Sequence, residues 1–372
     1  MKFLFACGGT AGHINPALAV AAQLRREIPD AEFLFIGAGR EMENRLVPRA
    51  GYELVSIRMS GLKRGFSPGD IVHNLATLKN LTAAITRTRG ILREFGPDAV
   101  IGTGGYICYP VLRTAAKMGV PTFIHESNAV PGLTTKLLSV RADKVLVSFP
   151  GLEGEYRRPD RVVFTGTPVR DGFEAPVDGI GAIETQRKPL VVSFWGSLGA
   201  ERMNEIMTEF IKLNIDSGSF DHIHATGRSG GELFEKRLKR LGVWDKLTPG
   251  TDIREYIEDM SAVMARADLI LCRAGGSTIA ELRALGKPAV LVPSPYVTND
   301  QQKENAMQVQ KDGGAVMLLE KDCTGSILFD VVSSILRDKA GLDGMAAAQK
   351  AFGVPDAASV IAGIILESCA AV

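Results

Sequence analysis

The chain of 372 residues carries 43 lysine and arginine residues against 42 aspartate and glutamate residues, a formal net charge of +1. This balance argues against a general nucleic-acid binder, because such proteins usually show a strong basic excess, although a local basic patch remains compatible with it. With 45% hydrophobic, 23% charged and 6% aromatic residues, the composition is typical of a soluble α/β protein, and the length predicts two domains.

The cysteines are scattered singly, with no C-x-x-C pair and no spacing typical of a metal site, which predicts reduced thiols in a cytosolic protein. Residues 3–6 are too few for the apolar region of a signal peptide, so we expect a first strand there. No run approaches the roughly 20 apolar residues of a membrane-spanning helix, so any membrane contact is expected to be peripheral. The five cysteines are Cys7, Cys108, Cys272, Cys323 and Cys369.

The first predicted unit is a buried strand over Lys2 to Ala6, the glycine-rich stretch GGTAGH at residues 8–13, and a helix to about Arg26. The stretch is not G-x-G-x-x-G. No acidic residue follows the next predicted strand, Glu32 to Ile36, at the distance that holds an adenosine ribose, which weakens a dinucleotide interpretation. We expect this loop to face the phosphates of a substrate. His13, at its end, is either a helix-capping residue or a reactive one.

A basic amphipathic segment extends from Arg58 to Arg93, with Asp70 as the opposing acid. Such a segment is by default a solvated helix with one face in the core. It can also lie on an anionic lipid surface, where each basic residue contributes on the order of 1 kcal/mol. The cations are Arg58, Lys63, Arg64, Lys79, Arg87, Arg89 and Arg93, and the apolar residues among them are Ile71, Leu75, Leu78, Leu81 and Ile85.

Two further predicted strands, Ala99 to Ile101 and Thr122 to Ile124, open onto loops of unusual composition. The first leads into GTGGY at residues 102–106. Its glycines leave room for the phosphates of a ligand, although a tight packing turn explains them nearly as well. The second leads into the polar tetrad HESN at residues 125–128, which is typical of a loop at the active edge of a parallel sheet.

The pattern of strand, glycine turn and helix occurs twice in the chain. Strands are predicted over Lys144 to Val147 and Val162 to Phe164, and residues 171–188 are rich in glycine, proline and charge, which indicates a linker. A strand over Leu190 to Phe194, the turn GSLG at 196–199 and a helix to about Leu213 then repeat the opening of the chain. Two such units predict two Rossmann-like domains that face each other across a cleft.

The segment from Leu269 combines a predicted strand with a sharp turn at Gly275-Gly276, where the absence of a Cβ lets the backbone turn. Ser277 or Thr278 can cap the helix that follows. This geometry directs backbone N–H groups and the positive end of a helix dipole at one point, which suits a diphosphate. Glu281 could accept hydrogen bonds from two ribose hydroxyls, or it could close a capping box with Thr278.

A polar loop, Asn299 to Gln302, follows the next predicted strand, Ala289 to Val292. Ligands of parallel α/β proteins bind in such loops, beyond the carboxyl ends of the strands. The tail, Asp356 to Glu367, has the pattern of an amphipathic helix.

Residues 272–306, CRAGGSTIAELRALGKPAVLVPSPYVTNDQQKENA, closely resemble the nucleotide-sugar segment of glycosyltransferase family 28, the bacterial GT-B family that forms lipid II. Shorter motifs extend the resemblance over nearly the whole chain. GGTAGHINP is similar to the first glycine loop of the family, HESN to its HEQN-type motif, GTPVR to its G-x-P-V-R segment and GSLG to its G-S-Q-G loop. The departures are Ala11 in place of a frequent glycine and Ser127 and Leu198 in place of glutamines.

The resemblance implies roles for the matched positions. His13 corresponds to the usual candidate for the general base, which takes a proton from the attacking sugar hydroxyl, and Glu126 is carried over as a catalytic or supporting residue. Ile257 would contact uracil through its backbone. The implied substrate-binding positions are Thr10, Ala11, Gly12, Asn128, Arg170, Ser197, Ile257, Gly276, Ser277, Thr278, Ile279, Ala280, Glu281, Gln301 and Gln302, and loops facing the acceptor phosphates add Gly9, Gly104, Gly105 and Tyr106.

The activity implied by the resemblance is inverting transfer of GlcNAc from UDP-GlcNAc to the C4 hydroxyl of MurNAc in lipid I, undecaprenyl-pyrophosphoryl-MurNAc-pentapeptide, giving lipid II with a β-1,4 link. Fixed dipoles at Ser197 and near Ser277 would stabilise the departing diphosphate, so we expect neither a cofactor nor an obligatory protein-bound metal. The alternatives are a GT-B transferase with another lipid or small acceptor, a UDP-GlcNAc 2-epimerase and a silent nucleotide-sugar sensor.

The family also implies where the protein works and how the chain divides. We expect a peripheral protein on the cytoplasmic face of the bacterial cell membrane, docked through its basic segment on the anionic inner leaflet. Residues 1–170 are expected to form the acceptor and membrane-docking domain, 171–188 the linker, and 189–345 the UDP-GlcNAc-binding domain. Residues 346–372 are expected to form a C-terminal helix that packs back on the N-terminal domain.

Overall fold

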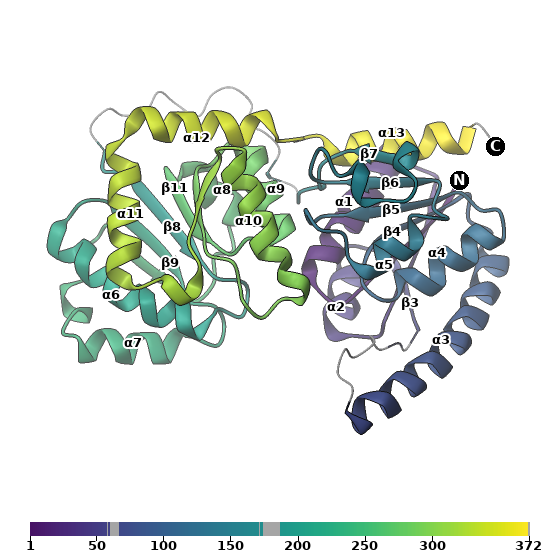
Figure 1. The fold of residues 1–372 in the computed structure, drawn as a ribbon, viewed down its shortest axis with the longest axis horizontal. Helices are drawn as coiled ribbons and strands as arrows, with labels where there is room; N and C mark the ends of the chain where they lie inside the picture. Colours follow the sequence, from purple (N-terminus) through teal and green to yellow (C-terminus); the bar gives the residue numbers. More distant parts are fainter. Residues whose placement is uncertain (58, 60–66, 171, 174–186, 371–372) are drawn as a thin grey trace. The chain divides into compact units, whose positions relative to one another are not determined.

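A computed structural model of the chain describes all residues except 58, 60–66, 171, 174–186 and 371–372 (Figure 1). The chain forms two compact units. Unit 1 comprises Met1–Asp171 and Asp356–Val372, and unit 2 comprises Gly172–Pro355. We describe each unit by itself.

Unit 1 contains a seven-stranded parallel sheet in the order β3-β2-β1-β4-β5-β6-β7. The strand order reverses between β1 and β4, and the carboxyl ends of these two strands lie next to each other, with Cys7 beside Gly104. In open α/β sheets this reversal point is where ligands bind. The strands are β1 Lys2–Cys7, β2 Glu32–Gly37, β3 Glu53–Ser56, β4 Ala99–Gly104, β5 Thr122–Glu126, β6 Lys144–Val147 and β7 Val162–Phe164.

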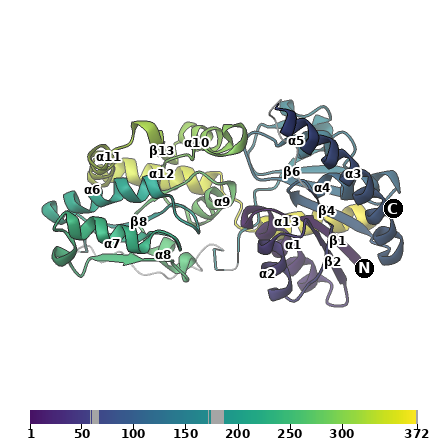
Figure 2. The ribbon, with the colours of Figure 1, turned by 90° about the horizontal axis from the view of Figure 1, so that it is seen from below.

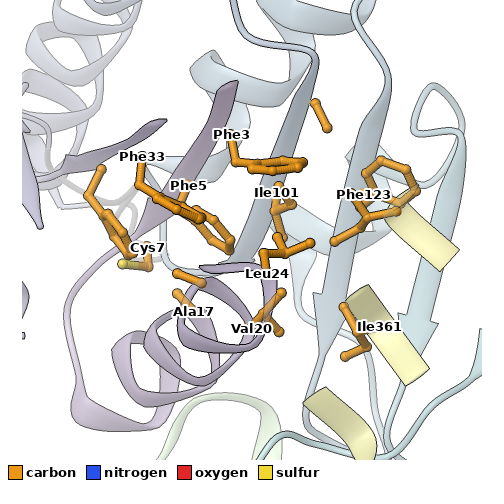
Figure 3. Close-up of a cluster of buried hydrophobic side chains, with 14 of the residues drawn as sticks. Phe3, Phe5, Cys7, Ala17, Val20, Leu24, Phe33, Ile101, Phe123 and Ile361 are labelled. Carbon is orange, nitrogen blue, oxygen red and sulfur yellow. The ribbon is translucent and has the colours of Figure 1, made fainter. Parts of the chain in front are cut away.

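Helices cover both faces of the unit 1 sheet. Successive residues of each strand point to opposite faces, so each strand contributes to both cores. Phe3, Phe5 and Cys7 pack on one face with residues of α1, α2 and α13 (Figure 3), whereas Leu4 and Ala6 pack on the other with residues of α3, α4 and α5. The helices of unit 1 are α1 Ala11–Glu27, α2 Glu41–Arg49, α3 Pro68–Phe95, α4 Cys108–Lys117, α5 Leu133–Leu138 and α13 Ala357–Ala370, with 3-10 turns at Glu153–Glu155 and Pro159–Arg161.

The last helix, α13, belongs to unit 1 although it follows unit 2 in the sequence. It lies beside α1 in the views of Figures 1 and 2 and contacts it. Ile361, Ala362 and Ile365 are buried in the same cluster as Phe3 and Phe5. The segment from Asp356 therefore completes one face of the first sheet.

Unit 2 contains a six-stranded parallel sheet in the order β10-β9-β8-β11-β12-β13. Its strand order reverses between β8 and β11, as that of unit 1 does between β1 and β4. The strands are β8 Leu190–Phe194, β9 Asp221–Ala225, β10 Thr251–Arg254, β11 Leu269–Cys272, β12 Ala289–Leu291 and β13 Ala315–Met317.

Helices also cover the second sheet. Phe210 of α6, Phe234 of α7 and Leu328 of α11 share one core with Val191 of β8 and Leu271 of β11. The helices of unit 2 are α6 Glu201–Ser217, α7 Gly231–Arg240, α8 Met260–Arg266, α9 Gly276–Leu285, α10 Gln301–Lys311, α11 Gly325–Arg337 and α12 Lys339–Ala351, with 3-10 turns at Trp244–Lys246, Thr298–Asp300 and Glu320–Asp322.

The expectation of two parallel-sheet, Rossmann-like units is confirmed, and each strand named from the sequence forms within a few residues of its expected bounds. The sequence also predicts a strand that ends around His222, His224 and Gly227, which is β9, whereas three strands were missed, namely β3, β10 and β13. All three lie at an edge of their sheet and are partly exposed. An edge strand lacks the continuous apolar run of a strand that is buried on both faces, which explains why the sequence pattern did not reveal them.

The expected basic segment falls partly outside the part of the chain that the structure describes. Arg58, Lys63 and Arg64 lie outside it, and the side chains of Ile71, Leu75, Leu78 and Lys79 are likewise not described. Within the described part, Arg87, Arg89 and Arg93 of α3 are exposed, and Ala84 and Leu92 enter the core. None of the described helices is both long enough and apolar enough to span a membrane.

Candidate active site

The first glycine turn of unit 1 joins β1 to α1. Gly9 has a positive φ of 94°, a conformation that favours glycine. Thr10 follows as the N-cap of α1 with an extended backbone and no side-chain capping hydrogen bond. Thr10, Ala11 and Gly12 thus form the amino-terminal edge of α1, where the helix dipole favours an anionic group.

His13 lies in the first turn of α1 and is held by the end of β4. The Thr103 hydroxyl donates a hydrogen bond of 2.6 Å to the His13 carbonyl oxygen. The imidazole packs on the backbone of Gly104, since a Cβ added to Gly104 would lie 2.1 Å from Nδ1 of His13. Any side chain at position 104 would therefore displace the ring.

The environment of His13 keeps its imidazole neutral. Its Nδ1 atom is buried and has no hydrogen-bond partner among the described residues. Burial lowers the pKa of His13 below its usual value, because the charged form loses hydration, and the carboxylate of Glu126 and the Thr103 backbone only partly oppose this. A neutral imidazole at pH 7 is the form that can accept a proton.

The second glycine loop packs against the first. Gly105 has a φ of 90°, and a Cβ at this position would lie 2.5 Å from the carbonyl oxygen of Gly8. Next to it, the Tyr106 side chain is 50% exposed. Close backbone packing therefore accounts for Gly104 and Gly105, whereas contact of these residues and Tyr106 with acceptor phosphates stays a prediction.

Glu126, at the end of β5, is buried, and both of its carboxylate oxygens accept hydrogen bonds. Oε1 accepts from the backbone N–H and the side-chain amide of Asn128, at 3.1 and 2.9 Å. Oε2 accepts from the backbone N–H of Gly132 and the hydroxyl of Thr135, at 2.9 and 2.7 Å. The carboxylate thus organises the loop that carries Asn128 and the start of α5.

The neighbouring His125 connects the strand ends to the TGTPVR segment. Its Nε2 donates to the carbonyl oxygen of Gly166 at 3.0 Å, and the Ser148 hydroxyl lies within hydrogen-bond distance of both His125 and Thr167. Burial lowers the pKa of His125, so its ring is neutral as well. Arg170, three residues beyond Thr167, is exposed. Sequence reasoning did not assign His125 this structural role.

The corresponding glycine turn of unit 2 follows β8. Gly199 and Gly227 are in backbone contact, since a Cβ on Gly227 would lie 2.1 Å from the nitrogen of Gly199. The carbonyl oxygen of Ser197 accepts a hydrogen bond of 3.3 Å from Arg228 N–H, and the Ser197 side chain is exposed at the carboxyl end of the strand. Leu198, where the family motif has glutamine, is 69% exposed.

Two histidines of β9 are core residues. His222 Nε2 and His224 Nδ1 both hydrogen-bond to the hydroxyl of Ser193, at 2.9 and 2.7 Å, and all three side chains are fully buried. Burial lowers the pKa of His222 to about 3 and that of His224 well below its usual value. This cluster belongs to the interior of unit 2.

The helix after β11 begins earlier than Ser277. Gly275 is the N-cap of α9 and, as a glycine, makes no side-chain capping hydrogen bond. The expectation that Ser277 or Thr278 caps it is therefore wrong, because the extended Gly275 allows the helix to start at Gly276. The capping-box interpretation of Glu281 fails with it, since a capping box needs the acid three residues after the N-cap, whereas Glu281 lies six residues after Gly275.

Packing brings the expected donor-binding segments of unit 2 together. The Asn305 side chain of α10 donates to the carbonyl oxygen of Ala274 at 3.0 Å, which fixes α10 beside the turn before α9. The turn before α9, the helix that carries Gly276, Ser277, Thr278, Ile279, Ala280 and Glu281, is thus joined to α10, the helix that carries Gln301 and Gln302. Glu281 and Ile257 are almost fully buried, with exposures of 7% and 1%.

The polar loop before α10 has an uncommon backbone. Asn299 and Asp300 adopt φ values of 58° and 51°, and they are the non-glycine residues with positive φ in the described part of the chain. Asparagine and aspartate adopt this region more readily than other side chains. Gln302 accepts a hydrogen bond of 2.8 Å from Ser294 N–H, so its carboxamide supports the loop.

One buried acid beside the first glycine turn was not anticipated. Glu43 of α2 is fully buried and accepts a hydrogen bond of 3.0 Å from Gly9 N–H. Gly9 was predicted to belong to a loop that faces the acceptor phosphates, and its N–H group donates to a side chain of the protein. The sequence carries no capping signal at this point, because arginine is not a residue type that typically caps a helix.

In the described part of the chain, no group of three or more His, Cys, Asp or Glu side chains is arranged to hold a metal ion. The expectation that no protein-bound metal is required stays a prediction.

Sequence profiles of glycosyltransferase family 28 match both units. The profile of the family's N-terminal domain matches residues 3–147, and that of its C-terminal domain matches residues 190–361. A protein of Acetivibrio thermocellus is 41% identical over 373 residues, covering 98% of this chain and 97% of the relative. It is named UDP-N-acetylglucosamine--N-acetylmuramyl-(pentapeptide) pyrophosphoryl-undecaprenol N-acetylglucosamine transferase.

Two solved structures have the same overall fold. The crystal structure of Acinetobacter baumannii MurG has a TM-score of 0.78 at 26% identity and covers 98% of this chain and 99% of its own. The UDP-GlcNAc 2-epimerase of Neisseria meningitidis has a TM-score of 0.67 at 14% identity and covers 99% and 100% of the two chains. At the lower identity the similarity concerns the fold alone.

Proposed function

The chain belongs to glycosyltransferase family 28, and on that basis we propose that it transfers GlcNAc from UDP-GlcNAc to the C4 hydroxyl of MurNAc in lipid I, forming lipid II with inversion at the anomeric carbon. The observation that carries this proposal is the 41% identity, over 98% of the chain, to a transferase named for this donor and acceptor. The UDP-GlcNAc 2-epimerase alternative rests on a 14% identical fold match and is not favoured.

We propose that unit 2 binds the donor. The amino terminus of α9, with Gly276 and Ser277, would face the diphosphate together with Ser197, because these groups lie at the carboxyl ends of β11 and β8. Backbone N–H groups and a helix dipole stabilise the negative charge that develops on UDP as the glycosidic bond breaks. Glu281, which has no place in a capping box, would accept hydrogen bonds from the ribose hydroxyls.

We propose that His13 of unit 1 is the general base. Its buried Nδ1 leaves Nε2 as the nitrogen that would take the proton of the C4 hydroxyl while the hydroxyl oxygen attacks the anomeric carbon. The C4 oxygen then gains the new bond to GlcNAc, UDP leaves with the electrons of the broken bond, and the proton remains on the imidazole. One displacement inverts the anomeric centre, and a covalent intermediate is not required.

The hydrogen bonds of Glu126 favour a supporting role over proton transfer. Its carboxylate accepts from four groups, so taking a proton would weaken contacts that hold Asn128 and the start of α5. We therefore assign Glu126 to positioning Asn128 against the nucleotide sugar, and its negative charge also raises the proton affinity of His13. Arg170 is assigned to the donor on the family resemblance alone.

We also propose that unit 1 docks peripherally on the anionic cytoplasmic face of the cell membrane. The apolar side chains of Leu133, Leu137 and Val140, at and just after α5, are 56%, 46% and 38% exposed. Cationic Lys136 and Arg141 lie among them, and α5 packs on α4, which packs on α3 with its exposed arginines. Exposed apolar groups mixed with cations suit an anionic lipid surface.

The test of the function is release of UDP from UDP-GlcNAc with and without a lipid I analogue, with the sugar product identified by mass spectrometry. We expect release to require the analogue and a disaccharide product to appear. Consumption of UDP-GlcNAc without acceptor would instead support an epimerase or a hydrolase. Turnover with another lipid but not with the lipid I analogue would reassign the acceptor.

Membrane docking has its own test. Vesicles with anionic lipid should sediment the wild-type protein, and Leu133→Ser with Leu137→Ser should lower the affinity for the vesicles by about 10- to 100-fold, since about 1 kcal/mol of apolar burial is lost for each half-exposed leucine. Exposed Leu233 and Leu241 of unit 2 provide the matched control pair. Equal binding of both double variants would exclude α5 from the docking surface.

A further inference from the structure

Glu43 is a fully buried acid on α2, in the third position of the helix that starts at Glu41. A carboxylate removed from water is costly unless its oxygens find hydrogen-bond donors. Oε1 of Glu43 accepts from Arg40 N–H at 2.9 Å, and Oε2 accepts from Gly9 N–H at 3.0 Å. The side chain therefore ties the start of α2 to the loop after β1, 34 residues earlier in the chain.

The backbone around Glu43 is shaped to admit it. A Cβ added to Gly8 would lie 2.7 Å from Oε2 of Glu43, and one added to Gly37 would lie 3.1 Å from Oε1. A side chain at either position would force the carboxylate to move. Glycine thus occupies both positions, Gly8 just after β1 and Gly37 at the end of β2, where the backbone packs against the carboxylate of Glu43.

The turn held by Glu43 is in contact with the second glycine loop on another side. Gly105 approaches the carbonyl oxygen of Gly8, and Gly104 packs against the imidazole of His13. The Gly8-Gly9 turn is therefore fixed by Glu43 on one side and by the end of β4 on the other. His13 follows Gly9 by four residues, and its backbone N–H bonds to the carbonyl oxygen of Thr10 at 3.0 Å.

We propose that Glu43 is a positioning residue for sugar transfer, whose buried carboxylate fixes the Gly8-Gly9 turn and thereby the imidazole of His13. This inference rests on the proposed function, and it concerns a residue that does not contact substrate. A misplacement of about 1 Å in a reacting group can reduce turnover by about 100-fold. We expect an effect of this size when the tether to Gly9 is lost.

The test uses Glu43→Gln in the full-length protein, with Glu41→Gln as the matched control because Glu41 is exposed on the same turn of α2. Glutamine keeps one acceptor oxygen but presents an NH2 group to the second backbone N–H. We expect kcat with a lipid I analogue to fall by about 100-fold, with UDP affinity within about twofold of wild type. Glu41→Gln should change neither quantity, and equal kcat values for the two variants would overturn the proposal.

A second measurement separates positioning from general loss of structure. If Glu43 acts through His13, then Glu43→Gln should cost less than about threefold in a His13→Ala background, since residues that act as a unit are strongly non-additive. The same 100-fold loss in both backgrounds would show that Glu43 does not act through His13, and would overturn the proposal.

A third measurement does not depend on turnover. Hydrogen exchange of peptides that cover residues 8–13 should be faster in Glu43→Gln than in wild type or Glu41→Gln, and unchanged exchange would overturn the tether. If the wild-type protein transfers no sugar, the proposed function fails by itself and exchange still decides whether Glu43 holds the turn. Should Glu43→Gln not fold, Glu43→Asp keeps the charge on a shorter side chain, and it should also speed exchange.

Discussion

The two units begin in the same way, but only unit 1 places a histidine at the turn. In unit 1, β1 leads through Gly8-Gly9 into α1, where His13 packs on the backbone of Gly104. In unit 2, β8 leads into α6 past Ser197, and its histidines lie inside the sheet on β9. Burial lowers the pKa of histidines in both units. The comparison teaches that a lowered pKa does not by itself mark a candidate base. The position of the histidine in the fold, at a glycine turn or inside the sheet, distinguishes a candidate base from a core residue.

Substitution of His13 is expected to have the largest effect. His13→Ala should lower kcat with a lipid I analogue by about 10²- to 10⁴-fold, the usual range for a general base, without weakening UDP binding to unit 2. Steady-state kinetics and a UDP titration measure the two quantities. Near-normal turnover of the variant would remove His13 from the role of base.

The pH dependence of turnover sharpens the same point. A general base works in its deprotonated form, so a lowered pKa keeps it active as the pH falls. The acid limb of kcat/KM should accordingly lie below pH 6.5, the ordinary value for histidine. A limb at pH 7 or above would contradict the burial of Nδ1 as the dominant influence on His13.

Glu281 tests the binding half of the comparison. Glu281→Ala should raise the KM for UDP-GlcNAc by about 10- to 100-fold, because hydrogen bonds to a charged group contribute about 1.5–3 kcal/mol, while kcat changes much less. The exposed Glu232 provides a control, Glu232→Ala. A loss confined to kcat would assign Glu281 to the chemical step. It would contradict the proposal that unit 2 binds the donor while unit 1 supplies the base.

Ser193→Ala should affect stability and leave the chemistry unchanged. The substitution removes the hydroxyl that His222 and His224 share, and each buried ring left without this partner costs about 1–3 kcal/mol. Both tryptophans, Trp195 and Trp244, lie in unit 2, so tryptophan fluorescence during urea unfolding reports this unit alone. The exposed Ser229 provides the control, and an equal unfolding midpoint for both variants would refute the prediction.

The smallest expected effect is a difference between the two units in how much stability each loses at acid pH. A histidine with a lowered pKa stays neutral in the folded protein while the unfolded chain takes up a proton, so stability is lost as the pH falls below about 6.5. For His222, whose pKa burial lowers to about 3, the loss at pH 5.5 is on the order of 1 kcal/mol. In unit 1 the charge of Glu126 opposes the shift at His13 and His125, whereas the shift at His222 is caused by burial alone.

We therefore expect unit 2 to lose stability first on acidification. Urea unfolding at pH 7.5, 6.5 and 5.5, followed by tryptophan fluorescence for unit 2 and by hydrogen exchange of β1 and β4 for unit 1, measures the two units separately. Unit 1 unfolding at lower urea than unit 2 at pH 5.5, with the reverse order at pH 7.5, would contradict this expectation.

The sequence predicted the two sheets because their inner strands are continuous apolar runs, as in Leu269–Cys272. The resemblance to the family named His13, Ser197 and Glu281 as site residues, and these roles stay predictions. What could not be predicted depends on tertiary contacts. The start of α9 was misjudged because an extended Gly275 serves as N-cap without a side chain, and Glu43 was missed because its partner, Gly9, offers only a backbone N–H.

The position of α13 has a consequence for synthesis of the chain. During translation the strands of the first sheet leave the ribosome within the first 164 residues, but the helix that carries Ile361 and Ile365 follows only after all of unit 2. Until then the nascent protein exposes part of the apolar surface around Phe3, Phe5 and α1. Unit 1 thus becomes complete last although it is made first. A chain that terminates early, after unit 2, would leave this apolar surface exposed to chaperones and proteases.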